Sequence, residues 1–316
     1  MNQAQHNFNH EHITVLLSEA VEHLVLKKNG VYVDCTFGRG GHSKLILEKL
    51  NQEGRLIAID RDKSAYEEGL KIKDTRFEIV HAHFSEIDQV LAARGISKVD
   101  GVLLDLGISS PQIDQGDRGF SFRFDAYLDM RMDQSAALTA AVVLNTYSHG
   151  ALAKIIQNYG EEKFASKIAE NIIKARSAGE LNTTKDLAQI VKDSIPAPAR
   201  RTGGNPAKRT FQAIRIEVNQ ELATLERAIP AALAALAIGG RLVVMSYQSL
   251  EDRIVKNFFT QATKSTTPVA LPVELPNSAA SFELLHSGST GANEAEQLSN
   301  PRSQSMRLRA IERRSA

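Results

Sequence analysis

The chain has 316 residues, of which 42% are hydrophobic and 24% charged, enough for one large α/β domain or a core domain carrying a smaller one. Its longest nearly apolar stretch, 229–238, contains a proline and is well short of the roughly 20 residues that cross a bilayer, and the N-terminus lacks the order of a secretory signal, so we expect a cytoplasmic protein without transmembrane helices. The formal net charge of +1 neither demands nor excludes a nucleic acid, whereas the single cysteine, Cys35, excludes an internal disulfide and leaves no thiolate metal site.

Short β-rich runs alternate with helical patterns, which is typical of a parallel sheet built from βαβ units. The expected strands lie at 31–35, 55–60, 77–81, 101–106 and 240–247. A helix is expected at 250–263, and the runs 282–285 and 306–312 could pair as an antiparallel edge. The sequence therefore predicts an α/β fold.

A glycine turn follows the first strand, in the segment 34–43 (DCTFGRGGHS). Such a turn lets the backbone approach a ligand and directs a helix N-terminus at it. A dinucleotide fingerprint needs a third glycine where this chain has Ser43, so NAD is disfavoured. The pattern Asp34-x-x-x-Gly38-x-Gly40 instead resembles the first motif of class I methyltransferases. Gly41 follows directly, and for His42 a backbone contact is the safer expectation, because a histidine in a first helical turn is usually only surface.

The second strand ends on Asp60, nineteen residues after Gly41. A carboxylate there can accept hydrogen bonds from a ribose diol, whether the ligand is NAD or S-adenosylmethionine. Alone, Asp60 is as easily a helix-capping acid. Combined with Asp34 and the glycines, it indicates a nucleoside cofactor.

The fourth strand ends in the segment 105–112 (DLGISSPQ), at the edge where such sheets place their chemistry. Hydrogen-bond acceptors around an aromatic amine would favour its attack on a sulfonium methyl group. Asp105, Ser109 and Ser110 are the candidate catalytic residues. Many amino-methyltransferases carry Asp/Asn-Pro-Pro-Tyr here and this chain does not, so Asp105 is also a candidate cofactor ligand.

The run 118–124 (RGFSFRF) alternates aromatic with small or basic residues. It could stack an extruded base on Phe122 and contact phosphate through Arg118, or it could bury its phenylalanines in a core. On the residues alone, the core interpretation is favoured.

The interval between the fourth and fifth strands is too long for one crossover, so we place an inserted helical domain at 112–213, with the flanking domain at 1–111 and 214–316. Phe164, Ile168 and Ile172 form an apolar stripe, and Thr183 or Thr184 is expected to cap a further helix. The segment 196–210, rich in Pro, Gly and Arg, is predicted to be an exposed loop.

A returning helix is predicted to face the sheet, because apolar residues recur at intervals of three or four. They are Phe211, Ile214, Val218, Leu222, Leu225 and Ile229. A second, polar stripe could be plain surface or could line a site; it comprises Lys208, Gln212, Arg215 and Asn219.

Basic residues gather in two places, although on charge alone a solvated face is the usual explanation. The first group is Arg200, Arg201, Lys208, Arg209 and Arg215, and the second is Arg302, Arg307, Arg309, Arg313 and Arg314.

Taken together, the motifs resemble the bacterial 16S ribosomal RNA cytidine N4-methyltransferase family, MraW. The matching segments run in order along the chain: HITVLLSE, DCTFGRGGHS, LIAIDRD, LLDLGISSPQ, RGFSF, LDMRMD, NPAKRTFQAIRIEVN, SLEDRIVK and residues 300–313. The resemblance implies a class I (Rossmann-like) methyltransferase sheet with an inserted helical substrate-recognition domain. It also implies S-adenosylmethionine as cofactor and methylation of the cytosine amine at position 1402, in the decoding centre of the small ribosomal subunit.

Carried over position by position, the resemblance implies cofactor contacts from seven residues: Gly40, Gly41, His42, Asp60, Phe84, Asp105 and Gln112. We add Asp34 and Gly38 from the motif itself. RNA contacts are expected from Arg118, Phe122, Lys208, Arg209 and Arg215. Whether the chain forms a homodimer stays open.

One segment departs from the family pattern. Members often have Ser-Phe-His-Ser-Leu-Glu-Asp-Arg after the fifth strand, whereas this chain has SYQSLEDR at 246–253. An obligatory histidine base is therefore doubtful, although Gln248 can still hydrogen-bond a base edge.

Two other functions are the alternatives. The chain could methylate a protein or a small molecule, or it could bind the cofactor without catalysis.

Overall fold

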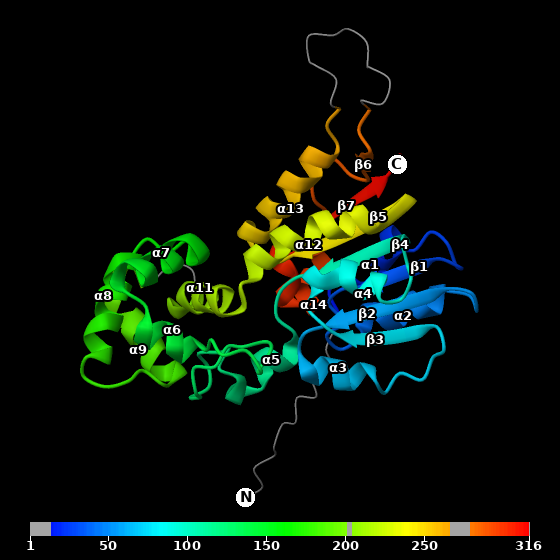
Figure 1. Ribbon diagram of the computed structural model, residues 1–316. Helices are drawn as coiled ribbons and strands as arrows, with labels where there is room; N and C mark the ends of the chain where they lie inside the picture. Colours follow the sequence, from blue (N-terminus) through cyan, green and yellow to red (C-terminus); the bar gives the residue numbers. More distant parts are fainter. Residues whose placement is uncertain (1–13, 201–203, 266–278, 316) are drawn as a thin grey trace, which may run out of the picture.

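A computed structural model describes residues 14–200, 204–265 and 279–315 and contains a mixed seven-stranded sheet in the order β3-β2-β1-β4-β5-β7-β6 (Figure 1). The strands are β1 (Val31–Asp34), β2 (Arg55–Asp60), β3 (Phe77–His81), β4 (Val99–Asp105), β5 (Leu236–Ser246), β6 (Phe282–Leu284) and β7 (Arg307–Arg313). The first five strands are parallel, and β7 pairs antiparallel with both β5 and β6. The predicted α/β sheet, including its antiparallel edge, is confirmed.

The fifth strand begins earlier than its sequence predicts, at Leu236 instead of 240. Its pairing with β4 shifts register between Val99 and Gly101, opposite the Gly239-Gly240 pair. Gly239 has a φ of +78°, a conformation that glycine adopts without steric cost. A glycine pair that looks like the start of a strand is thus an irregularity within it.

Alternation along the central strands gives each face of the sheet its own hydrophobic core. Val102 and Leu104 of β4 point to one face, and Leu103 points to the other. The first face is covered by α4 (Ile87–Ala92), α12 (Glu221–Ala235) and α13 (Ser249–Ala262), and the second by α1 (Leu17–Leu24) and α2 (Gly41–Lys49). Further helices at the sheet are α3 (Lys63–Gly69), η1 (Phe84–Glu86), α14 (Glu294–Ser299) and η3 (Pro301–Ser305). Within the described residues, no helix is long and apolar enough to span a membrane.

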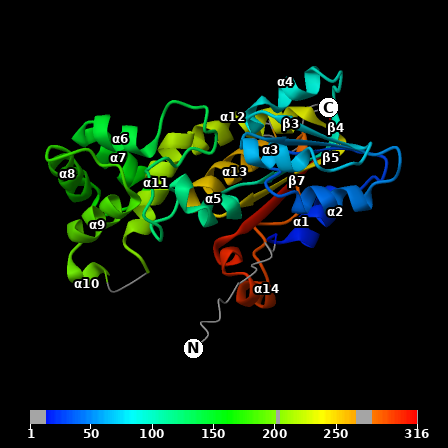
Figure 2. The same ribbon diagram turned by 90° about the horizontal axis from the view of Figure 1, so that it is seen from below.

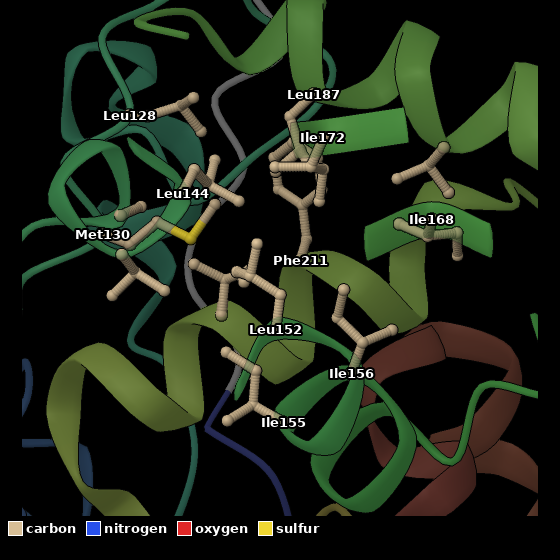
Figure 3. Packing of buried hydrophobic residues seen from close by; sticks show 14 of the residues in the cluster. Leu128, Met130, Leu144, Leu152, Ile155, Ile156, Ile168, Ile172, Leu187 and Phe211 are labelled. Atoms are coloured by element: carbon tan, nitrogen blue, oxygen red, sulfur yellow. The ribbon is translucent and has the colours of Figure 1, made fainter. Parts of the chain in front are cut away.

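The segment between β4 and α12 forms a helical insertion at one side of the sheet (green in Figures 1 and 2). Its elements are α5 (Ser110–Asp114), η2 (Gly116–Arg118), α6 (Ala140–Thr146), α7 (His149–Gly160), α8 (Ala165–Arg176), α9 (Thr184–Ser194), α10 (Ala197–Arg200) and α11 (Ala207–Asn219). Ile168 and Ile172 are buried as their spacing predicts, and Thr183 caps α9 by accepting a hydrogen bond from the Asp186 N–H. Figure 3 shows the separate core of this insertion, where Phe211 meets side chains from α6, α7, α8 and α9.

The predicted returning helix is in fact two helices, which corrects its assignment to the sheet. The chain breaks at Gln220, whose φ of 48° and ψ of 37° are left-handed. Before the break, Phe211, Ile214 and Val218 pack in the insertion core; after it, α12 packs on the sheet. The insertion core therefore extends to α11, beyond the boundary at 213.

Candidate active site

A cavity of about 1100 Å³ lies where the carboxyl ends of β1, β2, β4 and β5 meet the insertion. Parallel α/β sheets bind ligands at this edge, where the strand order reverses. The lining from the sheet side includes Gly38, Gly41, His42, Asp60, Asp62, Phe84, Asp105, Ser109, Gln112, Tyr247 and Glu251. The lining from the insertion includes Glu161, Lys163, Arg200, Lys208, Arg209, Gln212 and Arg215. The cavity is thus shared by both parts of the chain.

The glycine turn after β1 is built from residues with positive φ. Gly38 has a φ of +56° and Gly40 a φ of +74°. A Cβ on Gly40 would lie 2.7 Å from the Phe37 ring, so a side chain would be excluded there. Gly38, Gly41 and His42 line the cavity at the start of α2, and Gly40 lies behind them. The N–H groups of Gly38 and Gly40 are bonded to Asp60 Oδ2 and to the Phe37 carbonyl, so the turn is fixed from within and brings its backbone to the cavity without intervening side chains.

Asp34 supports this turn from the interior. Only 1% exposed, it accepts hydrogen bonds from the Ser43 hydroxyl at 2.7 Å and from the Thr36 N–H at 3.1 Å. Burial raises the pKa of its carboxyl. Its side chain does not line the cavity, so the contact that the structure gives Asp34 is with the loop itself.

Asp60 ties the glycine turn to the end of β2. Its Oδ2 accepts a hydrogen bond from the Gly38 N–H and its Oδ1 from the Asp62 N–H, both at 2.8 Å. Burial raises its pKa, and the two N–H donors oppose that effect. Each oxygen keeps a second lone pair with which a ligand hydroxyl can interact.

Asp62, which the sequence did not single out, joins the cofactor edge to the insertion. Its Oδ2 accepts hydrogen bonds from Gln112 Nε2 at 2.8 Å and from both terminal nitrogens of Arg118 at 3.2 Å. Burial alone would raise the pKa of Asp62, but the Gln112 bond and the Arg118 charge lower it below its usual value. Gln112 also accepts a hydrogen bond from the Ser109 N–H, which orders the loop after β4.

Asp105 ends β4 at the floor of the cavity. Its Oδ1 accepts a hydrogen bond from the Tyr247 hydroxyl at 2.9 Å, and its Oδ2 lies 3.6 Å from His42 Nδ1. Burial raises the pKa of Asp105 to about 7 and lowers that of His42, so near pH 7 a carboxyl that exchanges its proton faces a neutral imidazole. A carboxyl that titrates near neutrality suits proton transfer. Ser109 lines the cavity beside it, whereas the side chain of Ser110 lies outside what the structure describes.

Comparison with known proteins decides the family. Residues 9–314 match the model of the MraW methylase family. The chain belongs to the MraW methylase family. It is 50% identical to a ribosomal RNA small subunit methyltransferase H of Saccharopolyspora erythraea, over 96% of this chain and 93% of that protein. The protein of the same name from Methylobacillus flagellatus is 51% identical, over 96% of this chain and 94% of the relative.

As a member of this family the chain is a methyltransferase, and S-adenosylmethionine is its cofactor. The cavity fits that group: it is lined by glycines of the turn after β1, by the half-buried carboxylate of Asp60 at the end of β2, and by Phe84. The cofactor would fill only part of the cavity of about 1100 Å³, so space for an acceptor remains on the insertion side.

A group of charged residues with little exposure also lines this MraW-family site, and two of them, Glu221 and Glu251, were missed from the sequence. Arg215 makes two hydrogen bonds to Glu221, each 2.8 Å long. Glu251 accepts hydrogen bonds from the N–H groups of Tyr247 and Gln248, and burial together with the Glu221 charge raises its pKa to about 7. Three residues of the polar stripe on α11, Lys208, Gln212 and Arg215, therefore line the cavity, and Arg215 is already paired there. The fourth, Asn219, is instead hydrogen-bonded to the backbone of Met130 and Met132.

The remaining predicted RNA contacts divide into exposed and interior residues. Lys208 and Arg209 are exposed at the insertion side of the cavity. Arg118 is only 5% exposed, and the Phe122 ring packs edge-on against Phe211, with centroids 5.6 Å apart. Phe122 thus packs in the core, as the favoured interpretation of the 118–124 run predicts, and Arg118 donates hydrogen bonds to Asp62.

The two basic groups also differ in their surroundings. Arg200 joins Lys208 and Arg209 in the lining of the cavity, and Arg201 lies outside the described residues. In the second group, Arg307 and Arg309 pair with Asp252, and Arg314 pairs with Glu283 and Glu312. Only the first group therefore borders the cavity with described cations.

Proposed function

We propose that the chain methylates the N4 exocyclic amine of the cytidine at position 1402 of 16S ribosomal RNA, in the decoding centre of the small ribosomal subunit. The relatives at about 50% identity carry names that specify small-subunit ribosomal RNA. The observation that carries the proposal is Asp105, an acceptor with a pKa of about 7 at the floor of a cavity that exposed cations border. An aromatic amine at that position would meet an acceptor poised for its proton.

The glycine edge supports the cofactor. Gly38, Gly41 and His42 would supply the backbone contacts, while Gly40 and Asp34 would act by holding their turn in place. Asp60 would accept hydrogen bonds from the ribose, with the Phe84 ring against the adenine and Gln112 closing the edge. When bound, S-adenosylmethionine supplies a methyl group on a positively charged sulfur.

The acceptor amine needs help because its lone pair is delocalised into the cytosine ring. A hydrogen bond from that N–H to Asp105 would localise electron density on the nitrogen and favour its pyramidal form. As the nitrogen gains the methyl group it must lose one proton, which Asp105 Oδ2 would accept. Ser109, Ser110 and the loop carbonyls would hold the amine in line by offering further acceptors.

The RNA is expected to enter from the insertion side. Lys208 and Arg209 expose cationic groups at the cavity on α11, with Arg200 nearby, so backbone phosphates could be neutralised while one base reaches the floor. Arg215 would contribute by shaping the wall, because its guanidinium is held by Glu221.

The function is tested by locating the transferred methyl group. The purified chain, incubated with tritiated S-adenosylmethionine and unmodified small subunits, should incorporate label into the RNA, and mass spectrometry of nuclease digests should find N4-methylcytidine at position 1402. Subunits carrying uridine at 1402 are the matched control and should remain unlabelled. Equal labelling of those subunits, or label in ribosomal protein, would reject the proposal.

Replacing Asp60 should specifically weaken cofactor binding. We expect Asp60→Ala to lower the affinity for S-adenosylmethionine by about 10- to 100-fold, because the ribose contact and the tie to the Gly38 N–H are both lost. Isothermal titration calorimetry measures this. Asp74→Ala is the control, since Asp74 likewise accepts a backbone N–H two residues on, from Arg76, and lies outside the cavity lining. Equal affinities of both variants would contradict the assigned role.

A further inference from the structure

Tyr247 lies directly after β5 and reaches across the sheet edge to the end of β4. Its hydroxyl donates a hydrogen bond to Asp105 Oδ1 at 2.9 Å. The ring packs over Gly107, whose φ is +119° and where an added Cβ would lie 3.2 Å from Tyr247 Cδ2. The glycine turn after β4 therefore leaves the room that the tyrosine ring occupies beside the carboxylate.

The backbone of Tyr247 is itself fixed by the start of α13. Its N–H donates to Glu251 Oε2 at 2.9 Å, and the next N–H, from Gln248, donates to the same oxygen at 3.1 Å. Glu251 is only 3% exposed, so its carboxylate has little freedom to move. The direction of the tyrosine ring is thus set by a buried anchor.

The other oxygen of Asp105 has a different environment. Its Oδ2 lies 3.6 Å from His42 Nδ1, beyond normal hydrogen-bond length, and burial lowers the pKa of His42 so that the ring carries no charge near pH 7. The Asp105 side chain is 23% exposed, and the residue lines the cavity. One oxygen is therefore held by Tyr247 while the other remains available to a ligand.

We propose that Tyr247 is a positioning residue for methyl transfer: its hydroxyl holds Asp105 Oδ1 so that Oδ2 faces the acceptor amine, and it stabilises the charged carboxylate. The inference rests on the proposed methylation of a cytosine amine and extends it to a side chain at which this sequence departs from the family pattern. Tyr247 acts through Asp105 and is not assigned a contact with the acceptor.

The electrostatics of the pair agree with this role. Burial raises the pKa of Asp105, and the hydrogen bond from Tyr247 opposes that rise, leaving the value at about 7. Burial and the negative charge of Asp105 raise the pKa of Tyr247 well above its usual value, so the phenol remains a donor throughout the working range. The other titratable groups that face this pair are His42 from α2, Asp34 from β1, Glu251 from α13 and Glu296 from α14. These neighbours are uncharged or negative, so the phenol is the stabilising partner among them.

Tyr247→Phe removes the hydroxyl and keeps the ring, which is also the residue that family members often carry here. Without the donor, the pKa of Asp105 should rise, and the acid limb of the single-turnover rate should move up by about one pH unit. With that shift the variant should be about fivefold slower than the parent at pH 7 and within about twofold of it at pH 9. Rapid quench of labelled methyl transfer into small-subunit RNA gives both profiles.

Tyr147→Phe is the matched control, because the Tyr147 hydroxyl also donates to a carboxylate, that of Glu217 at 2.8 Å, and neither residue lines the cavity. Its profile should keep the parental midpoint. A Tyr247→Phe profile with an unchanged midpoint, whatever its rate, would overturn the role of Tyr247.

A second measurement does not depend on catalysis. Carbon-13 NMR titration of labelled aspartate carboxyls, with the Asp105 signal assigned by its loss in Asp105→Asn, should show the same upward shift in Tyr247→Phe, and an unshifted signal would reject the inference. Failure of the proposed function is recognised separately, because the parent enzyme would then produce no N4-methylcytidine.

Discussion

Replacing Asp105 with asparagine should lower the single-turnover rate of methyl transfer by about 10²- to 10³-fold. Asparagine can still accept the Tyr247 hydrogen bond through its carbonyl oxygen, but it then presents an NH₂ donor where Asp105 Oδ2 presents an acceptor. The acceptor amine would meet a donor and find no base for its proton. Quenched-flow measurement of N4-methylcytidine formation tests this, with calorimetry to verify that the cofactor still binds.

The pH dependence identifies the titrating group. Asp105 and Glu251 both have a pKa raised to about 7, chiefly by burial, so an acid limb near neutrality could arise from either. We expect Glu251→Gln to retain the limb and Asp105→Asn to lose it. If the limb persisted in Asp105→Asn and vanished in Glu251→Gln, Glu251 would be the titrating group, which would contradict the mechanism.

Asp105→Asn should also raise the free energy of unfolding at high pH. Because the pKa of Asp105 is higher in the folded chain than its usual 3.8, the native state binds more protons, and stability falls as pH rises from about 4 through about 7. Asp105→Asn carries no such cost. Its advantage in urea midpoint over the parent should therefore be larger at pH 8 than at pH 5, as expected for a group kept for activity and not for stability.

Arg118→Met should destabilise the chain by about 3–5 kcal/mol, because it leaves a buried carboxylate without its cation. Arg118 donates to Asp62 and to the carbonyls of Arg131 and Met132, and the side chains of Arg118 and Asp62 are 6% and 7% exposed. The change removes the charge and leaves the carbonyls of Arg131 and Met132 without the Arg118 donor. Urea unfolding followed by circular dichroism measures the loss, since the chain contains no tryptophan.

Arg123→Met is the control, because Arg123 lies five residues away and is exposed; its midpoint should move by less than about 0.5 kcal/mol. Adding Asp62→Asn to Arg118→Met should restore part of the loss by neutralising the stranded charge. If Arg118→Met instead kept its stability and weakened only RNA binding, the interior role of this arginine would be wrong.

The elements that depend on local pattern could be predicted from the sequence. Apolar runs indicated the strands, because a strand buried on both faces is continuously hydrophobic, and the glycines indicated the turn after β1. The break at Gln220 could not be found in this way. The three-to-four spacing continues through it, and a left-handed glutamine has no sequence signal comparable to glycine.

The partners of charged side chains were also beyond the sequence. Arg118 was assigned to RNA because a basic residue among phenylalanines suits a nucleic acid, yet its partner Asp62 lies 56 positions away and meets it only in the fold. Glu221 and Glu251 were passed over for a related reason: a glutamate in a helix is usually exposed, and these two are shielded only because α12 and α13 pack together beside the cavity. Asp105 was placed at the right edge because strand ends can be read locally.

The separate hydrophobic core of the insertion has a consequence for how the family can diversify. Its buried residues run from Phe120 to Val218 and share no member with the clusters under the sheet. Mutations that repack it can accumulate without disturbing the turn that carries Gly38 or the strands that end in Asp60 and Asp105. The insertion and the sheet can therefore change in sequence largely independently of each other, so the residues proposed to hold the RNA and those proposed to hold the methyl donor need not vary together.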